Sequence, residues 1–230
     1  QMRKIKLLVI GVAIIVSGAV AVGLDYNNPN DNSNNILRND DIVSYSLKNS
    51  DLESYKVTYF KGGKVFVKVA PKIYTKKDLL EYLEKRKKTV SYLSTMQPDR
   101  VVDVTITFNR KCSVEEYSAF LQKYGLKPTS YMYKSYPEGV GVFSAQIPEE
   151  LIKGMEGQIK EKYNDFRLID SVISFKTRVL AKDLVKLQKD SMVLMVDPGP
   201  VEVYVENSDA KIFVTVDYFY PSYVYSKQIN

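Results

Sequence analysis

The feature that most constrains this chain of 230 residues is an apolar run at positions 7–24, "LLVIGVAIIVSGAVAVGL". Three basic residues stand among the six that precede it, a pattern typical of a secretory leader. The run is close to the minimum of about 17 residues that can cross a bilayer as a helix. Because the cations precede the run, the positive-inside rule places the rest of the chain outside the cytoplasm.

Two interpretations of residues 1–24 remain open, a cleaved signal peptide and a transmembrane anchor. The small residues "AVA" at 19–21 offer a cleavage site, but they lie inside the apolar run. The stretch that follows is rich in Asn and Asp, so we expect residues 25–50 to form a flexible tether. The sequence thus predicts a membrane-anchored domain or a secreted protein, and the absence of a disulfide framework favours a prokaryotic cell surface.

The residue types that are missing exclude several chemistries. The chain has no histidine, and Cys112 is its only cysteine. The usual zinc sites, an intramolecular disulfide and the histidine-dependent catalytic pairs are therefore excluded. We predict no catalytic residues, no metal site and no cofactor, and we expect Cys112 to be an unpaired residue near the end of a strand.

The net charge of +6 does not indicate a nucleic-acid partner. Of the 33 basic residues, three belong to the leader, which leaves 30 against 27 acidic residues. The cluster "KRKK" at 85–88 has no accompanying motif, so we interpret it as the solvated face of a helix.

Hydrophobic periodicity predicts the elements of the first half of the globular part. Strands flank Gly62 and Gly63, which are typical of a hairpin turn. We expect a helix at 76–93 and a strand at 101–108, followed by a helix with a capping box from Ser113 to Glu116 and a stop at Gly125. The residues expected on the inner face of the first helix are Leu79, Leu80, Leu83, Val90 and Leu93.

The second half continues with a mixture of hairpins and crossovers. We expect a hairpin over 130–147, a helix at 149–166, a strand at 168–179, a short helix at 181–190 and a strand at 191–197. A last hairpin should pair "VEVYVE" with "KIFVTVDYFY".

This order predicts an α+β fold, with a mainly antiparallel sheet and helices on one face. The expected organisation has five parts. An N-terminal hydrophobic helix and the tether precede a hairpin plus helix at 51–100, a ferredoxin-like β-α-β-β-α-β core at 101–200, and a hairpin with an aromatic tail at 201–230.

Three stretches resemble a known family. "VDVTITFNRKCSVEEYSAFLQKYGLKP", "VFSAQIPEELI" and "LAKDLVKLQKDSMVLMVDP" are similar to segments of subtilisin propeptides and related inhibitor I9-type domains, over about 101–198. The resemblance implies a domain that chaperones and inhibits a protease, with the chain after the last strand lying in the enzyme's cleft. That segment would begin near Asp197, Pro198 and Gly199. The chain departs from the family in an insertion of about 30 residues and in the prolines Pro198 and Pro200.

Two segments are the predicted binding surfaces for another protein. One is the segment 197–200, and the other is the aromatic tail around Pro221. The predicted contact residues are Asp197, Pro198, Gly199, Pro200, Tyr218, Phe219, Tyr220, Tyr223 and Tyr225.

The sequence therefore favours a non-enzymatic, extracytoplasmic protein-interaction domain, with a propeptide-like or inhibitor-like role as its narrowest form. The alternative is a structural subunit of a cell surface or membrane complex that assembles through sheet edges and the tail. A carboxylate enzyme is the third hypothesis. The expected partners are the membrane, through residues 7–24 if they are retained, and another protein, but not nucleic acid.

Overall fold

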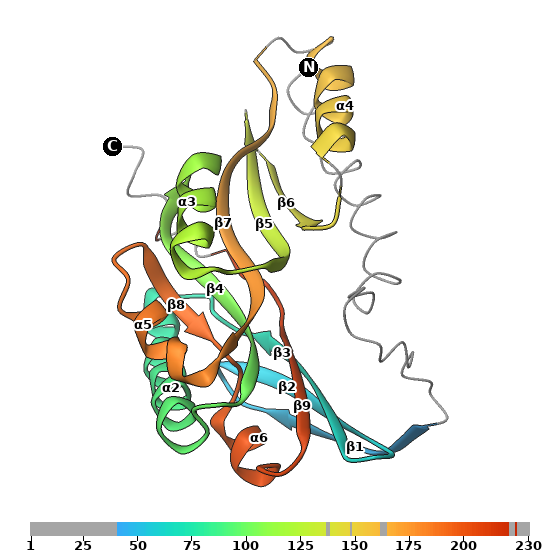
Figure 1. The fold of residues 1–230 in the computed structure, drawn as a ribbon, viewed down its shortest axis with the longest axis vertical. Coiled ribbons are helices and arrows are strands. Elements are labelled where there is room, and N and C mark those ends of the chain that lie inside the picture. Colours follow the sequence, from blue (N-terminus) through green and yellow to red (C-terminus); the bar gives the residue numbers. More distant parts are fainter. Residues whose placement is uncertain (1–40, 137–138, 148, 162–164, 221–223, 225–230) are drawn as a thin grey trace. The chain divides into compact units, whose positions relative to one another are not determined.

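The structure is a computed structural model, and it describes residues 41–136, 139–147, 149–161, 165–220 and 224 (Figure 1). The predicted leader and most of the predicted tether lie outside these residues, as do Tyr223 and Tyr225.

The first sheet has four strands, in the order β1-β2-β3-β9. Its strands are β1 (Ile42–Asn49), β2 (Glu53–Phe60), β3 (Lys64–Pro71) and β9 (Lys211–Val216). The first three are antiparallel, and β9 lies parallel to β3. The predicted turn between β2 and β3 is confirmed, since Gly62 and Gly63 have φ angles of 79° and 72°. Glycine adopts this left-handed conformation without the steric cost of a Cβ atom.

Strand β1 lies where the sequence predicted a tether over 25–50. The folded part therefore begins at Ile42 or before it. The predicted boundary between the tether and the folded part, at residue 51, lies too far along the chain. Strand β1 was missed although its apolar residues Val43, Tyr45 and Leu47 alternate with polar ones, because this short stretch directly follows the Asn- and Asp-rich segment.

Helix α2 (Lys76–Met96) confirms the predicted helix and extends it by one turn. It begins with a capping box in which Thr75 accepts from the Asp78 N–H and Asp78 accepts from the Thr75 N–H. Two predictions about its faces are wrong. Leu80 is 54% exposed, and Arg86, which was expected on the solvated side, is 1% exposed.

The second sheet has five strands, in the order β6-β5-β7-β4-β8. Its strands are β4 (Val101–Cys112), β5 (Pro128–Tyr136), β6 (Gly139–Ser144), β7 (Arg167–Leu180) and β8 (Val193–Asp197). Strands β4 and β8 pair antiparallel, as do β5 and β6. The predicted α+β class with mainly antiparallel pairing is therefore confirmed. The predicted position of Cys112 is also confirmed, since this buried residue is the last of β4.

Four helical segments connect the strands of this sheet: α3 (Val114–Tyr124), α4 (Glu149–Lys160), the 3-10 turn η2 (Ala181–Asp183) and α5 (Leu184–Gln188). The predicted caps of α3 are confirmed, because Ser113 and Glu116 form the capping box and Gly125 ends the helix at a φ of 62°. Helix α4 is shorter than the predicted 149–166. Phe166 lies beyond it and is buried next to Leu168 in a cluster that Ile152 and Met155 of α4 also contact.

The chain divides into two compact units, with the described residues of one at 111–175 and of the other at 41–110 and 176–224. Strands β4 and β7 contribute residues to both units. In the smaller unit, Tyr117 and Phe120 of α3 pack on Phe175, with ring centroids 5.4 and 6.0 Å apart. Tyr133 and Phe143 stack with centroids 4.5 Å apart.

The predicted C-terminal hairpin is wrong. Residues "VEVYVE" form helix α6 (Val201–Glu206), and β9 pairs with β3 instead. Pro200 occupies the N-cap position, and the consecutive residues Val203 and Tyr204 are both buried, which a two-residue strand period would not allow on one face. The Tyr204 hydroxyl donates to the Pro198 carbonyl at 2.7 Å.

Gly141 allows a direct test of packing in the smaller unit. A Cβ atom at this position would lie 2.5 Å from the Tyr133 hydroxyl oxygen, and the Tyr133 ring is stacked on Phe143. We expect Gly141→Ala to lower the free energy of unfolding by about 1–3 kcal/mol through overpacking.

The matched control is Gly157→Ala, because no atom lies within 4 Å of a Cβ atom built on this residue of α4. This change should leave stability unchanged or raise it by up to about 1 kcal/mol. Urea denaturation followed by circular dichroism measures both variants. Equal effects of the two substitutions would contradict the packing described for Tyr133.

Candidate functional site

A cluster of buried polar and charged side chains joins three elements of the larger unit. We call Glu53 of β2, Tyr82 and Arg86 of α2, and Asp197 at the end of β8 the Arg86 cluster. All four are at most 2% exposed. The Arg86 side chain forms an ion pair with the Glu53 carboxylate through Nη2, and its Nε lies 2.7 Å from Oδ1 of Asp197.

Hydrogen bonds fix the geometry of the cluster. The Tyr82 hydroxyl donates to Oδ2 of Asp197 at 2.7 Å and accepts from Nη2 of Arg86 at 2.8 Å. The guanidinium also lies over the Tyr82 ring, 4.3 Å from its centroid. The Nε–Asp197 approach does not have hydrogen-bond geometry, so that contact is electrostatic. Lys85 lies at the rim, where its ammonium contacts Oε1 of Glu53 at 3.1 Å.

The charges of the cluster compensate one another. Burial raises the pKa of the Asp197 carboxyl, and the nearby Arg86 opposes this without overcoming it. Burial would lower the pKa of Arg86, but the charge of Asp197, with help from Tyr82 and Glu53, raises it. The pKa of Asp197 is thus set mainly by burial, and that of Arg86 by the groups around it. Isolated buried charges cost several kcal/mol each, so this pairing is a condition of the fold.

The predicted contact segment 197–200 lies inside the domain. Asp197, Pro198, Gly199 and Pro200 are all buried. The Gly199 N–H donates to Oδ1 of Asp197 at 2.8 Å, and its φ of 88° together with a close approach to Val214 requires glycine there. In this conformation the segment presents no surface to a partner, and its residues position helix α6.

The aromatic tail is described in part. Tyr218, Phe219 and Tyr220 are half-buried, whereas Tyr223 and Tyr225 lie outside the described residues. Phe219 makes an edge contact with Tyr82, with centroids 6.4 Å apart, and Lys176 lies 4.9 Å from the centroid of the Tyr218 ring. The start of the tail therefore packs on its own domain, next to the Arg86 cluster.

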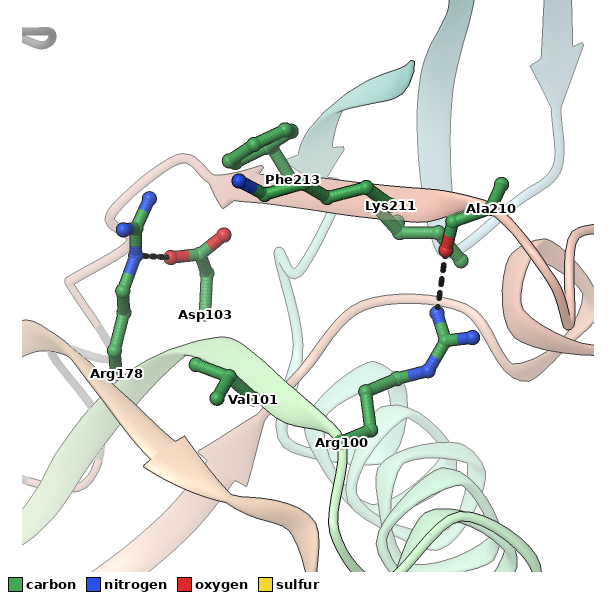
Figure 2. Close-up of a pocket in the computed structure, with 8 residues that line it drawn as sticks. Arg100, Val101, Asp103, Arg178, Ala210, Lys211 and Phe213 are labelled. Carbon is green, nitrogen blue, oxygen red and sulfur yellow. Dashed lines mark hydrogen bonds and ion pairs between the residues drawn. The ribbon is translucent and has the colours of Figure 1, made fainter. Parts of the chain in front are cut away.

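A surface depression of about 320 Å³ lies along β9 (Figure 2). Three of its charged groups, those of Arg100, Asp103 and Arg178, are used within the domain. Nε of Arg178 pairs with Oδ1 of Asp103 at 2.6 Å, the other Asp103 oxygen accepts from the Val214 N–H at 3.2 Å, and Arg100 donates to the Ala210 carbonyl at 3.3 Å. These contacts occupy the outer edge of β9. The depression thus lies where these contacts cover one edge of the four-stranded sheet.

At the opposite edge of that sheet, no strand of the described residues pairs with β1 on its outer side. Val43, Tyr45 and Leu47 are 64%, 63% and 71% exposed. The Ser50 N–H donates to the Glu53 carbonyl at 2.8 Å, and the bonding pairs alternate from that turn. Ser44, Ser46 and Lys48 therefore bond to β2, whereas Tyr45 and Leu47 direct their N–H and C=O groups away from the sheet.

Within the described residues, no three or more acidic or cysteine side chains are placed to bind a metal ion. No described helix is both long and apolar enough to cross a bilayer.

Sequence reasoning missed Arg86, Glu53, Tyr82 and the β1 edge, and identified Asp197 for another role. The available signal for Arg86 was its place on the helix. It lies four and seven positions from Tyr82 and Leu79, on the same face, whereas its neighbours in "KRKK" do not.

The Arg86 cluster predicts a large difference between two adjacent cations that contact Glu53. Arg86→Met should lower the free energy of unfolding by about 3–5 kcal/mol, because it leaves two buried carboxylates without their counter-charge. Lys85→Met should cost at most about 1 kcal/mol, because the Lys85 side chain is 41% exposed and its pair is screened by water.

Thermal and urea unfolding of the two variants measure this difference. Similar stabilities for Arg86→Met and Lys85→Met would show that the guanidinium is not required for the packing of α2.

Comparison with protein-family models, with curated proteins and with solved structures found no match to this chain.

Proposed function

We propose that the chain is a non-enzymatic, extracytoplasmic domain, membrane-anchored or secreted, that works by contact with another protein, and that the contact surface is the free edge of β1. The observation that carries the proposal is the exposure of Val43, Tyr45 and Leu47 beside backbone groups that pair with no strand in the described part of the chain. The location follows from the apolar run at 7–24 and the cations before it.

An open edge with apolar side chains supports strand addition. Proteins usually protect edge strands with charges, prolines or covering segments, because an unprotected edge recruits other strands. Strand β1 has one charged residue, Lys48, whose ammonium is paired with Glu206 at 2.8 Å. A partner strand would gain main-chain hydrogen bonds along β1, and the exposed side chains would give specificity.

We also propose that the core at 101–200 is ferredoxin-like, and the order of its elements supports this. Without β6 and α4, the chain order is β4-α3-β5-β7-α5-β8. In the sheet, β7 lies between β5 and β4, and β4 lies between β7 and β8. This order is compatible with two interleaved split βαβ units, the arrangement of ferredoxin-like domains, in which β6 and α4 would be an insertion. The resemblance to subtilisin propeptides is compatible with this order.

A protease-inhibitor role is the less supported form of the proposal. It needs an extended segment after the last strand of the core, and here that segment is buried and leads into α6. A second candidate is assembly into a cell-surface or membrane complex through the same β1 edge. It differs from the first in the partner, which would be another copy of the chain.

Photo-crosslinking in cells tests the edge. A photo-crosslinking amino acid in place of Tyr45 should give an adduct, and one in place of Leu80 on α2 should not, although Leu80 is 54% exposed. An added Leu47→Pro change removes a free N–H from the edge and leaves the bonds to β2 in place, so it should abolish the Tyr45 adduct.

A product with twice the mass of the chain identifies assembly, and another mass identifies a different partner. Adducts of equal yield from positions 45 and 80, or an adduct that survives Leu47→Pro, would exclude the β1 edge as the contact.

The location has a separate test. Intact cells treated with a membrane-impermeant amine reagent should show labelling of the chain, because its described lysines would lie outside the cytoplasm. Labelling that appears only after lysis would refute the extracytoplasmic location and leave the edge contact to be judged by crosslinking.

A further inference from the structure

The four-stranded sheet has a second, charged surface. The registers of its strands place alternate residues on the face opposite the buried valines of β2 and β3. We call this the basic face. Its cations are Lys56, Lys64, Lys68 and Lys211, and its aromatic residues are Tyr45, Phe60, Phe66 and Phe213.

Few acids balance these cations. Lys56, Lys68 and Lys211 are exposed, and Lys64 is half-exposed. Within the strands, the registers place no described acid on this face, and just beyond β9 the Asp217 carboxylate lies 3.9 Å from Lys68. Asp41, Asp51 and Asp209 stand beside the ends of the strands. Asp103 lies beside β9, but it is paired with Arg178. The face therefore carries a net positive charge.

The aromatic rings lie among the lysines and fill the face. The Lys56 ammonium lies 4.9 Å from the centroid of the Tyr45 ring, and that of Lys211 lies 5.2 Å from the centroid of Phe213. Thr58 faces Tyr45 and Phe66 across the strands and is buried at 6% exposure. The larger side chains beside Thr58 cover it. We therefore expect the centre of the face to contact a broad surface rather than a protruding ligand.

Apolar groups border the basic face at β1. Ile42, Val43 and Leu47 are exposed there, next to Tyr45. Strand β1 is also where the chain arrives from the predicted leader. Lysines that meet head groups, together with aliphatic and aromatic side chains that enter the interface, are the composition of a surface that binds anionic bilayers.

We propose that the basic face docks on the surface of an anionic lipid bilayer. The lysines contact lipid phosphates, and Tyr45 and Leu47 insert at the level of the head groups. Single-stranded nucleic acid also binds basic surfaces with aromatic residues, but the aliphatic border and the apolar run favour lipid. The inference requires that the chain lie beside a membrane, as proposed above, and it does not require a protein partner on the β1 edge.

The test uses the full chain in nanodiscs, with an environment-sensitive dye on Ser54→Cys of the basic face. The native Cys112 is buried and does not compete for the reagent under native conditions. In nanodiscs with about one-third anionic lipid, we expect a blue shift of the dye and quenching by lipid-attached quenchers, both reversed by high salt. In neutral nanodiscs, and with the dye on Lys88→Cys of α2, neither should occur.

Charge variants measure the contribution of the lysines. Each lysine near an anionic surface contributes about fivefold to binding, so Lys56→Gln, Lys68→Gln and Lys211→Gln together should reduce the docked-to-free ratio about 100-fold. The matched control replaces three exposed lysines elsewhere, Lys76, Lys88 and Lys189, and should change the ratio less than twofold.

Three results would overturn the inference: equal docking on neutral and anionic nanodiscs, equal losses in the two triple variants, or a dye response to a single-stranded oligonucleotide in place of anionic lipid. Because these readouts involve no second protein, they are independent of the crosslinking test of β1.

Discussion

The ion pairs of Arg86 are the interaction on which the larger unit depends. This one side chain connects β2 through Glu53 and β8 through Asp197, and its own helix supplies Tyr82 to complete the hydrogen bonds. Charges buried to this degree are tolerated only in a fixed geometry, so the pairs define how α2 lies on the four-stranded sheet. Asp197 extends this order to Gly199 and so to the start of α6.

The two edges of the four-stranded sheet differ in whether other side chains cover them. Strand β9 is closed by Asp103, Arg100 and Arg178, whose charged groups bond to its backbone or to one another. No described residue covers strand β1 in this way, although it exposes the most apolar surface of the sheet. The open edge and the lysine-rich face beside it are the features on which we base the two proposed contacts. These proposed roles overlap at Tyr45 and Leu47, whose side chains serve both surfaces, whereas the backbone groups of β1 serve the edge alone.

Local sequence signals predicted most of the elements but few of the long-range relations. The capping box of Ser113 and Glu116 and the turn at Gly62 and Gly63 depend on neighbours in the chain, and both were confirmed. Arg86 shares a helix face with Tyr82, which is a local signal, but its partners Glu53 and Asp197 lie 33 and 111 positions away in the sequence and no local pattern identifies them. Helix α6 was mistaken for a strand because a run of six alternating residues fits both periods.

The candidate surfaces were predicted less well than the fold. The segment 197–200 was selected through the resemblance to propeptide domains and the tail as a tyrosine-rich stretch. The structure buries the first and half-buries Tyr218, Phe219 and Tyr220 of the second. Strand β1 was interpreted as part of a tether because it directly follows an Asn- and Asp-rich stretch, although its own residues alternate between apolar and polar. Its role depends on what lies beside it, and a single sequence does not contain that information.

Residue-resolved hydrogen exchange of the purified full chain, without a partner, tests the open edge of β1 most directly. The account predicts that the amides of Tyr45 and Leu47 exchange at nearly unprotected rates, while those of Ser44, Ser46 and Lys48, bonded to β2, exchange much more slowly. Strong protection of all five amides would contradict it, because the edge would then already be covered by the chain itself.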